Sequence, residues 1–99
     1  MSESNMSSHT QRVAEVMRPK TGGEKKALTT TTAASVNTYN GFVDLSTDAD
    51  CFIRFGAAAV VDTDYKLLSG FSYRFRAENE QIHGICASGT ANLDISPVE

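Results

Sequence analysis

The stretch CFIRFG, residues 51–56, decides the fold class of this 99-residue chain. Its odd-numbered positions hold Cys, Ile and Phe, its even-numbered positions include Arg54, and a glycine ends it. A period of two residues predicts a β-strand with one face toward a core and one face that carries a charge.

Similar stretches follow from residue 28 onward, separated by Asn, Asp, Gly and Ser, which favour turns. The expected strands are 28–36, 42–45, 51–55, 57–61, 65–68, 71–76, 81–87 and 90–96. Six to eight short strands of this kind predict an all-β fold, either a small antiparallel β-sandwich or a barrel. The core is expected to hold the apolar residues of these strands: Val43, Leu45, Ile53, Phe55, Val60, Leu67, Phe71, Tyr73, Phe75, Ile82, Ile85, Leu93 and Ile95.

Residues 1–27 differ from the rest because they contain no aromatic residue and few apolar ones. Such a segment cannot bury enough apolar surface to fold alone, so we expect an extended N-terminal arm over 1–27 and a sandwich domain over 28–99. Val13, Val16 and Met17 have helical spacing, which predicts one short helix that stops before Pro19.

Charge is distributed unevenly along the chain. Residues 1–40 contain five basic and three acidic residues, whereas residues 41–99 contain four basic and nine acidic residues. The arm is therefore expected to bind an acidic surface of a partner, with solvated lysines as the simpler alternative. A net charge of −3 argues against a nucleic-acid partner.

The remaining chemistry-bearing residues do not form a recognisable catalytic or metal site. His83 and Cys86 would point to opposite faces of a strand, and no second ligand pair accompanies them. No nucleophile motif accompanies His83, so we expect no enzyme activity, no metal and no cofactor. Paired carboxylates at 48/50 and 62/64 are better explained as turn residues than as calcium ligands.

The N-terminus lacks the apolar region of a secretory signal, and no stretch is long and apolar enough to span a membrane. We therefore expect synthesis in a cytoplasm and no membrane partner. Cys51 and Cys86 are expected to stay free thiols in that compartment.

Eight residues are candidates for binding a protein partner. In the body of the chain, the expected strands place three arginines on the faces opposite the aromatic residues, where they could form one stripe for carboxylates of a partner or an ordinary solvated face. In the arm, the basic and apolar residues around the short helix are the candidates. The full set is Arg12, Val13, Val16, Met17, Arg18, Arg54, Arg74 and Arg76.

The order DCFIRFG, a Val-rich segment, FSYRFR and IHGICASGTANLDI, within residues 42–96, resembles small virion proteins of tailed bacteriophages. This resemblance implies a β-sandwich on the phage particle, and in particular a capsid decoration or cement protein without catalytic residues. It further implies binding to the major capsid protein or other virion subunits, and homo-oligomers in the assembled particle.

Two alternatives remain open from the sequence. One is a head–tail connector, tail or fibre-attachment protein of the same particle. The other is a free-standing carbohydrate- or protein-binding module, for which Tyr39, Phe42 and Phe52 are the candidate platform aromatics.

Overall fold

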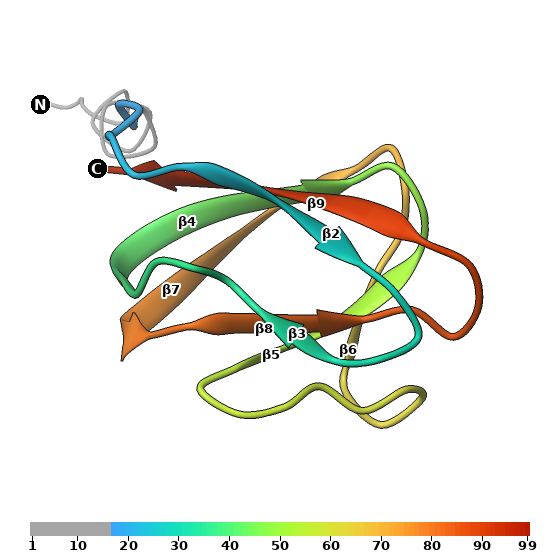
Figure 1. Cartoon of the computed structure of the whole chain (residues 1–99). Helices are drawn as coiled ribbons and strands as arrows, with labels where there is room; N and C mark the ends of the chain where they lie inside the picture. The colour runs from blue at the N-terminus through green and yellow to red at the C-terminus, as the bar shows by residue number, and fades with distance from the viewer. Residues whose placement is uncertain (1–16) are drawn as a thin grey trace, which may run out of the picture.

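The structure is a computed structural model, and residues 17–99 are described. Eight strands form two antiparallel sheets of four strands each, and no helix occurs in the described residues (Figure 1). The strands are β2 (Glu24–Leu28), β3 (Ala33–Ala34), β4 (Tyr39–Thr47), β5 (Cys51–Phe55), β6 (Tyr65–Leu67), β7 (Ser72–Glu80), β8 (Ile82–Ile85) and β9 (Ala91–Val98). The all-β prediction is confirmed, and this arrangement is compatible with a small β-sandwich. The predicted helix at Val13 and Val16, together with Arg12, lies outside the described residues.

One sheet has the strand order β2-β9-β4-β7, and the other has the order β3-β8-β5-β6. The inward faces of both sheets supply the core, as the alternating burial of β4 and β9 in one sheet and of β8 in the other shows. The most deeply buried large side chains are Leu28, Val43, Leu45, Leu67, Ile82, Leu93 and Ile95. Most of these were expected, because a period of two residues directly reports which face of a strand is buried.

Several expectations about strands and core are wrong. Residues 28–36 do not form one strand, because a bend in which the Thr31 N–H donates to the Thr29 hydroxyl (3.1 Å) separates Leu28, the end of β2, from the short β3. Residues 57–61 form no strand and belong to the loop between β5 and β6, although the stretch is apolar. Val60 in this loop is 46% exposed, and Phe71 is 59% exposed in the connection before β7. Residues 77–80, which lie between the expected strands 71–76 and 81–87, continue β7 because they pair with the start of β4, with a bulge near Asn79, whose φ is 58°.

The boundary expected between residues 27 and 28 is also corrected. Glu24–Leu28 forms the edge strand β2 and pairs with β9 from Glu24 opposite Ile95 to Leu28 opposite Ala91. Lysine and glutamate are depleted in strands, so the sequence EKKAL is a weak strand signal. Pairing with a strand almost seventy residues later supplies what local propensity lacks.

Leu28 connects β2 to the opposite sheet. Its side chain is fully buried, and it lies directly over Gly84 of β8. A Cβ at position 84 would come within 2.6 Å of Leu28 Cδ1 and 2.9 Å of Cδ2. Gly84 is therefore required for the close packing of the two sheets at this point.

Glu24 at the start of β2 holds the loop before β4. Its carboxylate accepts hydrogen bonds from the Val36 N–H (2.9 Å), the Asn37 N–H (3.0 Å) and the Tyr39 hydroxyl (2.8 Å). The Tyr39 hydroxyl also lies 2.9 Å from the carbonyl oxygen of Gly22. Burial and the hydrogen bond to Glu24 raise the pKa of Tyr39 to about 12. For Glu24, burial raises the pKa, but the three hydrogen bonds outweigh it, so the pKa is lowered overall.

The segment before β2 lies beside the C-terminus. The backbone groups of Arg18 and Glu99 exchange two hydrogen bonds (2.6 and 2.8 Å), and the Lys20 N–H donates to the Pro97 carbonyl (2.8 Å). Residues 18–28 are thus part of the folded body rather than of a free arm. In the described range 17–99, no helix could cross a membrane.

Candidate functional site

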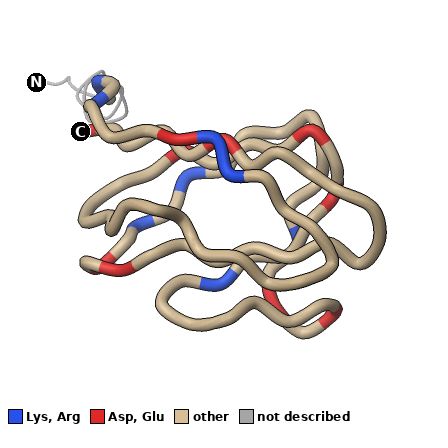
Figure 2. The backbone as a smooth tube through the Cα atoms, viewed as in Figure 1, with Lys and Arg blue, Asp and Glu red and all other residues tan. Residues whose placement is uncertain are grey.

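The three body arginines do not form one stripe. Arg54 belongs to β5, whereas Arg74 and Arg76 belong to β7 in the other sheet, so their outward faces point away from each other. Figure 2 shows the basic positions spread over several strands. Of the two alternatives drawn from the sequence, the single stripe is not formed, because sheet membership depends on long-range pairing, which a single strand's pattern does not contain.

Two of these arginines are already paired. Arg74 donates from Nε (2.7 Å) and Nη2 (2.9 Å) to the Asp44 carboxylate on the neighbouring strand β4, and this fork lowers the pKa of Asp44. Arg54 binds Asp64, as described below. Among the described residues, Arg76 forms no ion pair. Met17 is half-buried and Arg18 is exposed, with its Nη2 3.9 Å from a Glu99 carboxylate oxygen.

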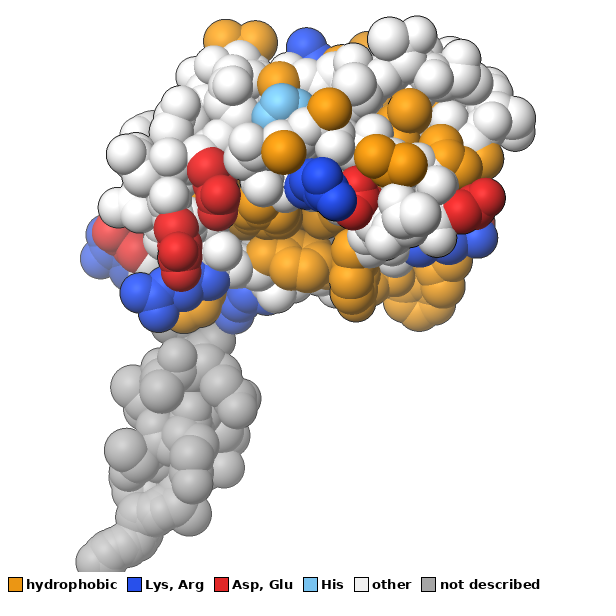
Figure 3. Space-filling view, turned by 90° about the horizontal axis from the view of Figure 1, so that it is seen from below, with side chains coloured by type: hydrophobic (Ala, Val, Ile, Leu, Met, Phe, Trp, Pro, Cys, Tyr) orange, Lys and Arg blue, Asp and Glu red, His pale blue; other side chains and the backbone are white. Residues whose placement is uncertain are grey.

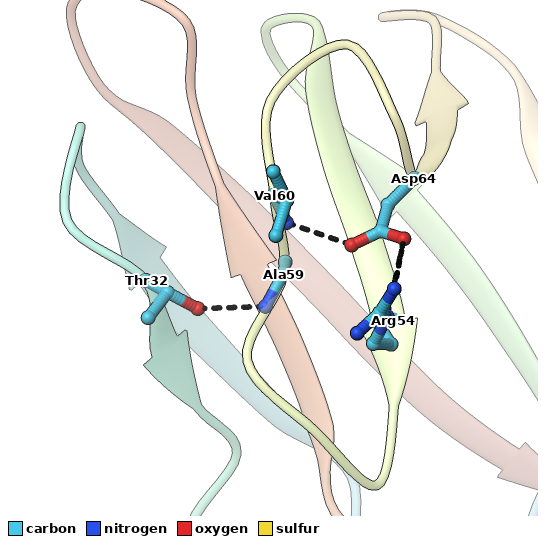
Figure 4. Close-up of polar contacts among 5 residues, drawn as sticks. All are labelled: Thr32, Arg54, Ala59, Val60 and Asp64. Atoms are coloured by element: carbon cyan, nitrogen blue, oxygen red, sulfur yellow. Dashed lines mark hydrogen bonds and ion pairs between the residues drawn. The ribbon is translucent and has the colours of Figure 1, made fainter.

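The β5–β6 loop, residues 56–64, is held in one conformation by side-chain hydrogen bonds (Figure 4). Asp64 accepts from Arg54 Nε (3.1 Å) on one carboxylate oxygen and from the Val60 N–H (2.7 Å) on the other. At the far end, the Thr32 hydroxyl accepts the Ala59 N–H (3.0 Å). The predicted turn role of Asp64 is therefore confirmed, and the loop is anchored to β5 and to the segment before β3.

The anchored loop exposes apolar side chains. Its sequence GAAAVV contains six small or aliphatic residues, of which Ala57, Ala58 and Val60 are exposed, while Ala59 is buried. Most surface loops are polar, so an apolar loop held by a rigid scaffold is a candidate for contact with a partner. The sequence pattern predicts a strand here, because apolar runs of this length are common in strands, and this prediction is wrong.

The anchoring of this loop is testable. We expect Asp64→Asn to lower the free energy of unfolding by about 1–2 kcal/mol, because it removes the charge that Arg54 and the Val60 amide bind. Amide exchange at Ala59 and Val60, followed by NMR, should accelerate in the variant. Asp62→Asn is the matched control: Asp62 is exposed at φ 69°, a conformation that asparagine adopts readily. Equal exchange rates in both variants would show that Asp64 does not hold the loop.

A second surface lies where β6 and β7 form the free edges of the two sheets. We call it the open-edge patch, and it consists of Phe55, Tyr65, Leu68, Phe71, Tyr73 and Phe75. Tyr65 packs edge-on against Phe75 (5.4 Å between ring centroids) and Tyr73 (6.1 Å), and Phe55 lies 5.7 Å from Phe75.

Much of this patch is open to solvent. Tyr65 is 56%, Phe71 59% and Leu68 43% exposed, whereas Tyr73 and Phe75 are half-buried. Figure 3 shows a contiguous hydrophobic region on the lower face, with charged side chains at its rim. Exposed apolar regions of this kind commonly mark protein–protein contacts.

The aromatics expected for a carbohydrate platform do not form one. Tyr39 and Phe52 are buried, at 4% and 7% exposure, and only Phe42 is substantially exposed. The most exposed aromatics are instead Tyr65 and Phe71. The sequence places Tyr65 in the expected strand 65–68 and Phe71 in the expected core. Their alternation with polar residues is the same as that of buried positions, so the sequence gives no signal that separates them.

The described residues place no metal ligand set together: no three His, Cys, Asp or Glu side chains gather in 17–99. Cys51 and Cys86 are free and buried, and burial raises the pKa of both thiols, which makes them poor nucleophiles. Two shallow pockets, of about 260 and 440 Å³, are lined by neither histidine nor cysteine. The expectation of a non-enzymatic protein without metal or cofactor stays a prediction.

Comparison with known proteins gives no relative. No protein-family model matches the chain, and neither a curated protein nor a solved structure is significantly similar to it. The resemblance to phage virion proteins is thus a prediction from sequence motifs alone.

Proposed function

We propose that this chain is a non-enzymatic structural protein of a tailed-bacteriophage particle. It is made in the host cytoplasm and binds the assembled head as a decoration or cement protein, with the major capsid protein or another virion subunit as its partner. The class of function rests on the motif resemblance and on a small β-fold that presents apolar surfaces.

The β5–β6 loop is the observation that carries this proposal. Its exposed residues Ala57, Ala58 and Val60 are apolar, and Asp64 and Thr32 hold the backbone in place. A loop that is ordered before binding loses little conformational entropy when a partner covers it, so small side chains suffice for a useful affinity. The arm residues Arg12, Val13 and Val16 lie outside the described residues and stay predicted contacts.

The proposal is tested with a bulky charge in the loop. We expect Ala58→Arg to weaken binding to phage heads assembled without this protein by about tenfold or more, because a buried unpaired charge opposes association. Co-sedimentation with the heads over a concentration series measures the dissociation constant. The matched control is Ala87→Arg, which places the same group at an exposed alanine between β8 and β9.

The outcomes separate the candidate functions. Loss of head binding in Ala58→Arg alone supports the proposal, whereas equal binding of both variants removes the loop from the interface. Binding of the wild-type chain to purified tails but not to heads would favour the connector or tail alternative. Binding to neither particle would refute a virion role.

A further inference from the structure

Strand β7 presents a long edge that no other described strand covers. It is the last strand in the order β2-β9-β4-β7; eight of its nine residues pair with β4, and none pairs with another described strand. A strand of this length runs about 30 Å and carries a row of backbone donors and acceptors on its open side. Such an edge is a template for strand addition by another chain.

The outward side chains of this edge are self-complementary in charge. Arg74, Arg76 and Glu78 alternate with Phe75 and Ala77 and point away from the core. Neither Arg76 nor Glu78 forms an ion pair with a described residue. In an antiparallel pairing of two β7 strands centred on Ala77, each Arg76 lies opposite Glu78 of the other copy. Opposite charges in directly facing positions stabilise a strand pair.

We infer that the chain forms a two-fold symmetric dimer through antiparallel pairing of β7 with β7 of a second copy, centred on Ala77. The β2-β9-β4-β7 sheets of the two copies then join into one continuous sheet of eight strands. A two-fold axis presents the same surface from both copies, so a pattern that complements itself is what such an interface requires. This inference concerns the chain alone and does not depend on a role in a virion.

The open-edge patch lies at the start of β7, beside the proposed interface. Tyr73 and Phe75 belong to β7 itself, and Tyr65 packs against both rings. In the pairing centred on Ala77, Phe75 faces Asn79 of the second copy, and Phe71 lies beyond the paired residues. The patches of the two copies therefore flank the strand pair at its opposite ends, and its centre is held by backbone hydrogen bonds and by the Arg76–Glu78 charge pairs.

Features that commonly protect an edge are present but do not block this pairing. Charged residues and bulges keep many edge strands apart. Here the charges attract in the antiparallel arrangement, and the bulge at Asn79 lies next to the end of the strand, two residues from the central Ala77. The Glu78 N–H now binds the Glu80 carboxylate of its own chain at 3.0 Å. Pairing replaces this contact by a backbone carbonyl of the second copy.

The full-length chain is tested by sedimentation velocity from micromolar to millimolar concentration. The wild type should dimerise, and Arg76→Glu or Glu78→Arg alone should raise the dissociation constant by tenfold or more, because each creates like-charge pairs twice in the symmetric interface. Lys20→Glu is the control for Arg76→Glu, since it makes the same change in net charge away from β7. Circular dichroism and thermal unfolding establish that each variant is folded.

Mixing the two single variants tests the register. Arg76→Glu has two acidic groups at these positions and Glu78→Arg has two basic groups, so together they should form a heterodimer that is tighter than either homodimer. The double variant R76E/E78R should dimerise like the wild type. A wild-type monomer at millimolar concentration overturns the inference. So does a dimer that neither single charge reversal weakens.

Discussion

Replacing Leu28 by alanine is expected to lower the free energy of unfolding by about 2–5 kcal/mol, the largest effect of any single substitution considered. Leu28 is fully buried between the two sheets, and its loss leaves a cavity at the junction of β2 and β8. Domains of this size are stable by only about 5–15 kcal/mol, so urea or thermal unfolding should show a large shift. Leu68→Ala is the control, because Leu68 is 43% exposed and its loss should cost little.

Gly84 allows a sharper test of the same contact. Gly84→Ala alone should destabilise by about 1–3 kcal/mol, since the added Cβ would lie 2.6 Å from Leu28 Cδ1. When Leu28→Ala and Gly84→Ala are combined, the new methyl group at position 84 occupies the space that the Leu28 side chain vacates. The double-mutant cycle should therefore give a cost below the sum of the two single costs. Additive costs would show that Leu28 does not pack on Gly84.

The second large effect is a loss of stability at alkaline pH. The pKa of Tyr39 is raised to about 12 in the folded protein, so the folded state keeps the phenol proton after the unfolded state has lost it. This contribution is complete below about pH 10 and is lost as the pH rises toward 12. A difference of about two pKa units corresponds to about 2–3 kcal/mol. Urea unfolding at a series of pH values measures it.

Two variants assign this pH dependence. Tyr39→Phe should be less stable at neutral pH and should lack the alkaline loss, whereas Tyr65→Phe, which removes a hydroxyl from the open-edge patch, should retain it. Glu24→Gln removes the charge that opposes ionisation of Tyr39. It should also remove an acid-side loss, because the lowered pKa of Glu24 stabilises the fold above about pH 4.5 and less so as the pH falls. An unchanged alkaline profile in Tyr39→Phe would contradict the assignment.

The strands with clear alternation were predictable. CFIRF forms β5 and SYRFR lies in β7 because apolar and polar residues alternate in them, and alternation is a local property. EKKAL was missed because its residues favour other structures, and only the partner strand β9 makes it a strand. AAAVV was expected to be a strand, yet contacts of Asp64 and Thr32, invisible in the sequence, hold it as a loop.

The candidate sites divide in the same way. The sequence by itself determined which residues are apolar, which carboxylates suit turns, and that Arg74 and Arg76 take alternating positions in one strand, whereas only pairing with β4 placed Glu78 in that strand. Only the tertiary structure decided that Arg54 lies in a different sheet from Arg76, that β7 is an edge, and that Tyr65 and Phe71 are exposed. The physical reason is the sequence separation of the interactions involved. The two faces of a strand follow from neighbouring residues, whereas its place in a sheet follows from hydrogen bonds between segments far apart in the chain.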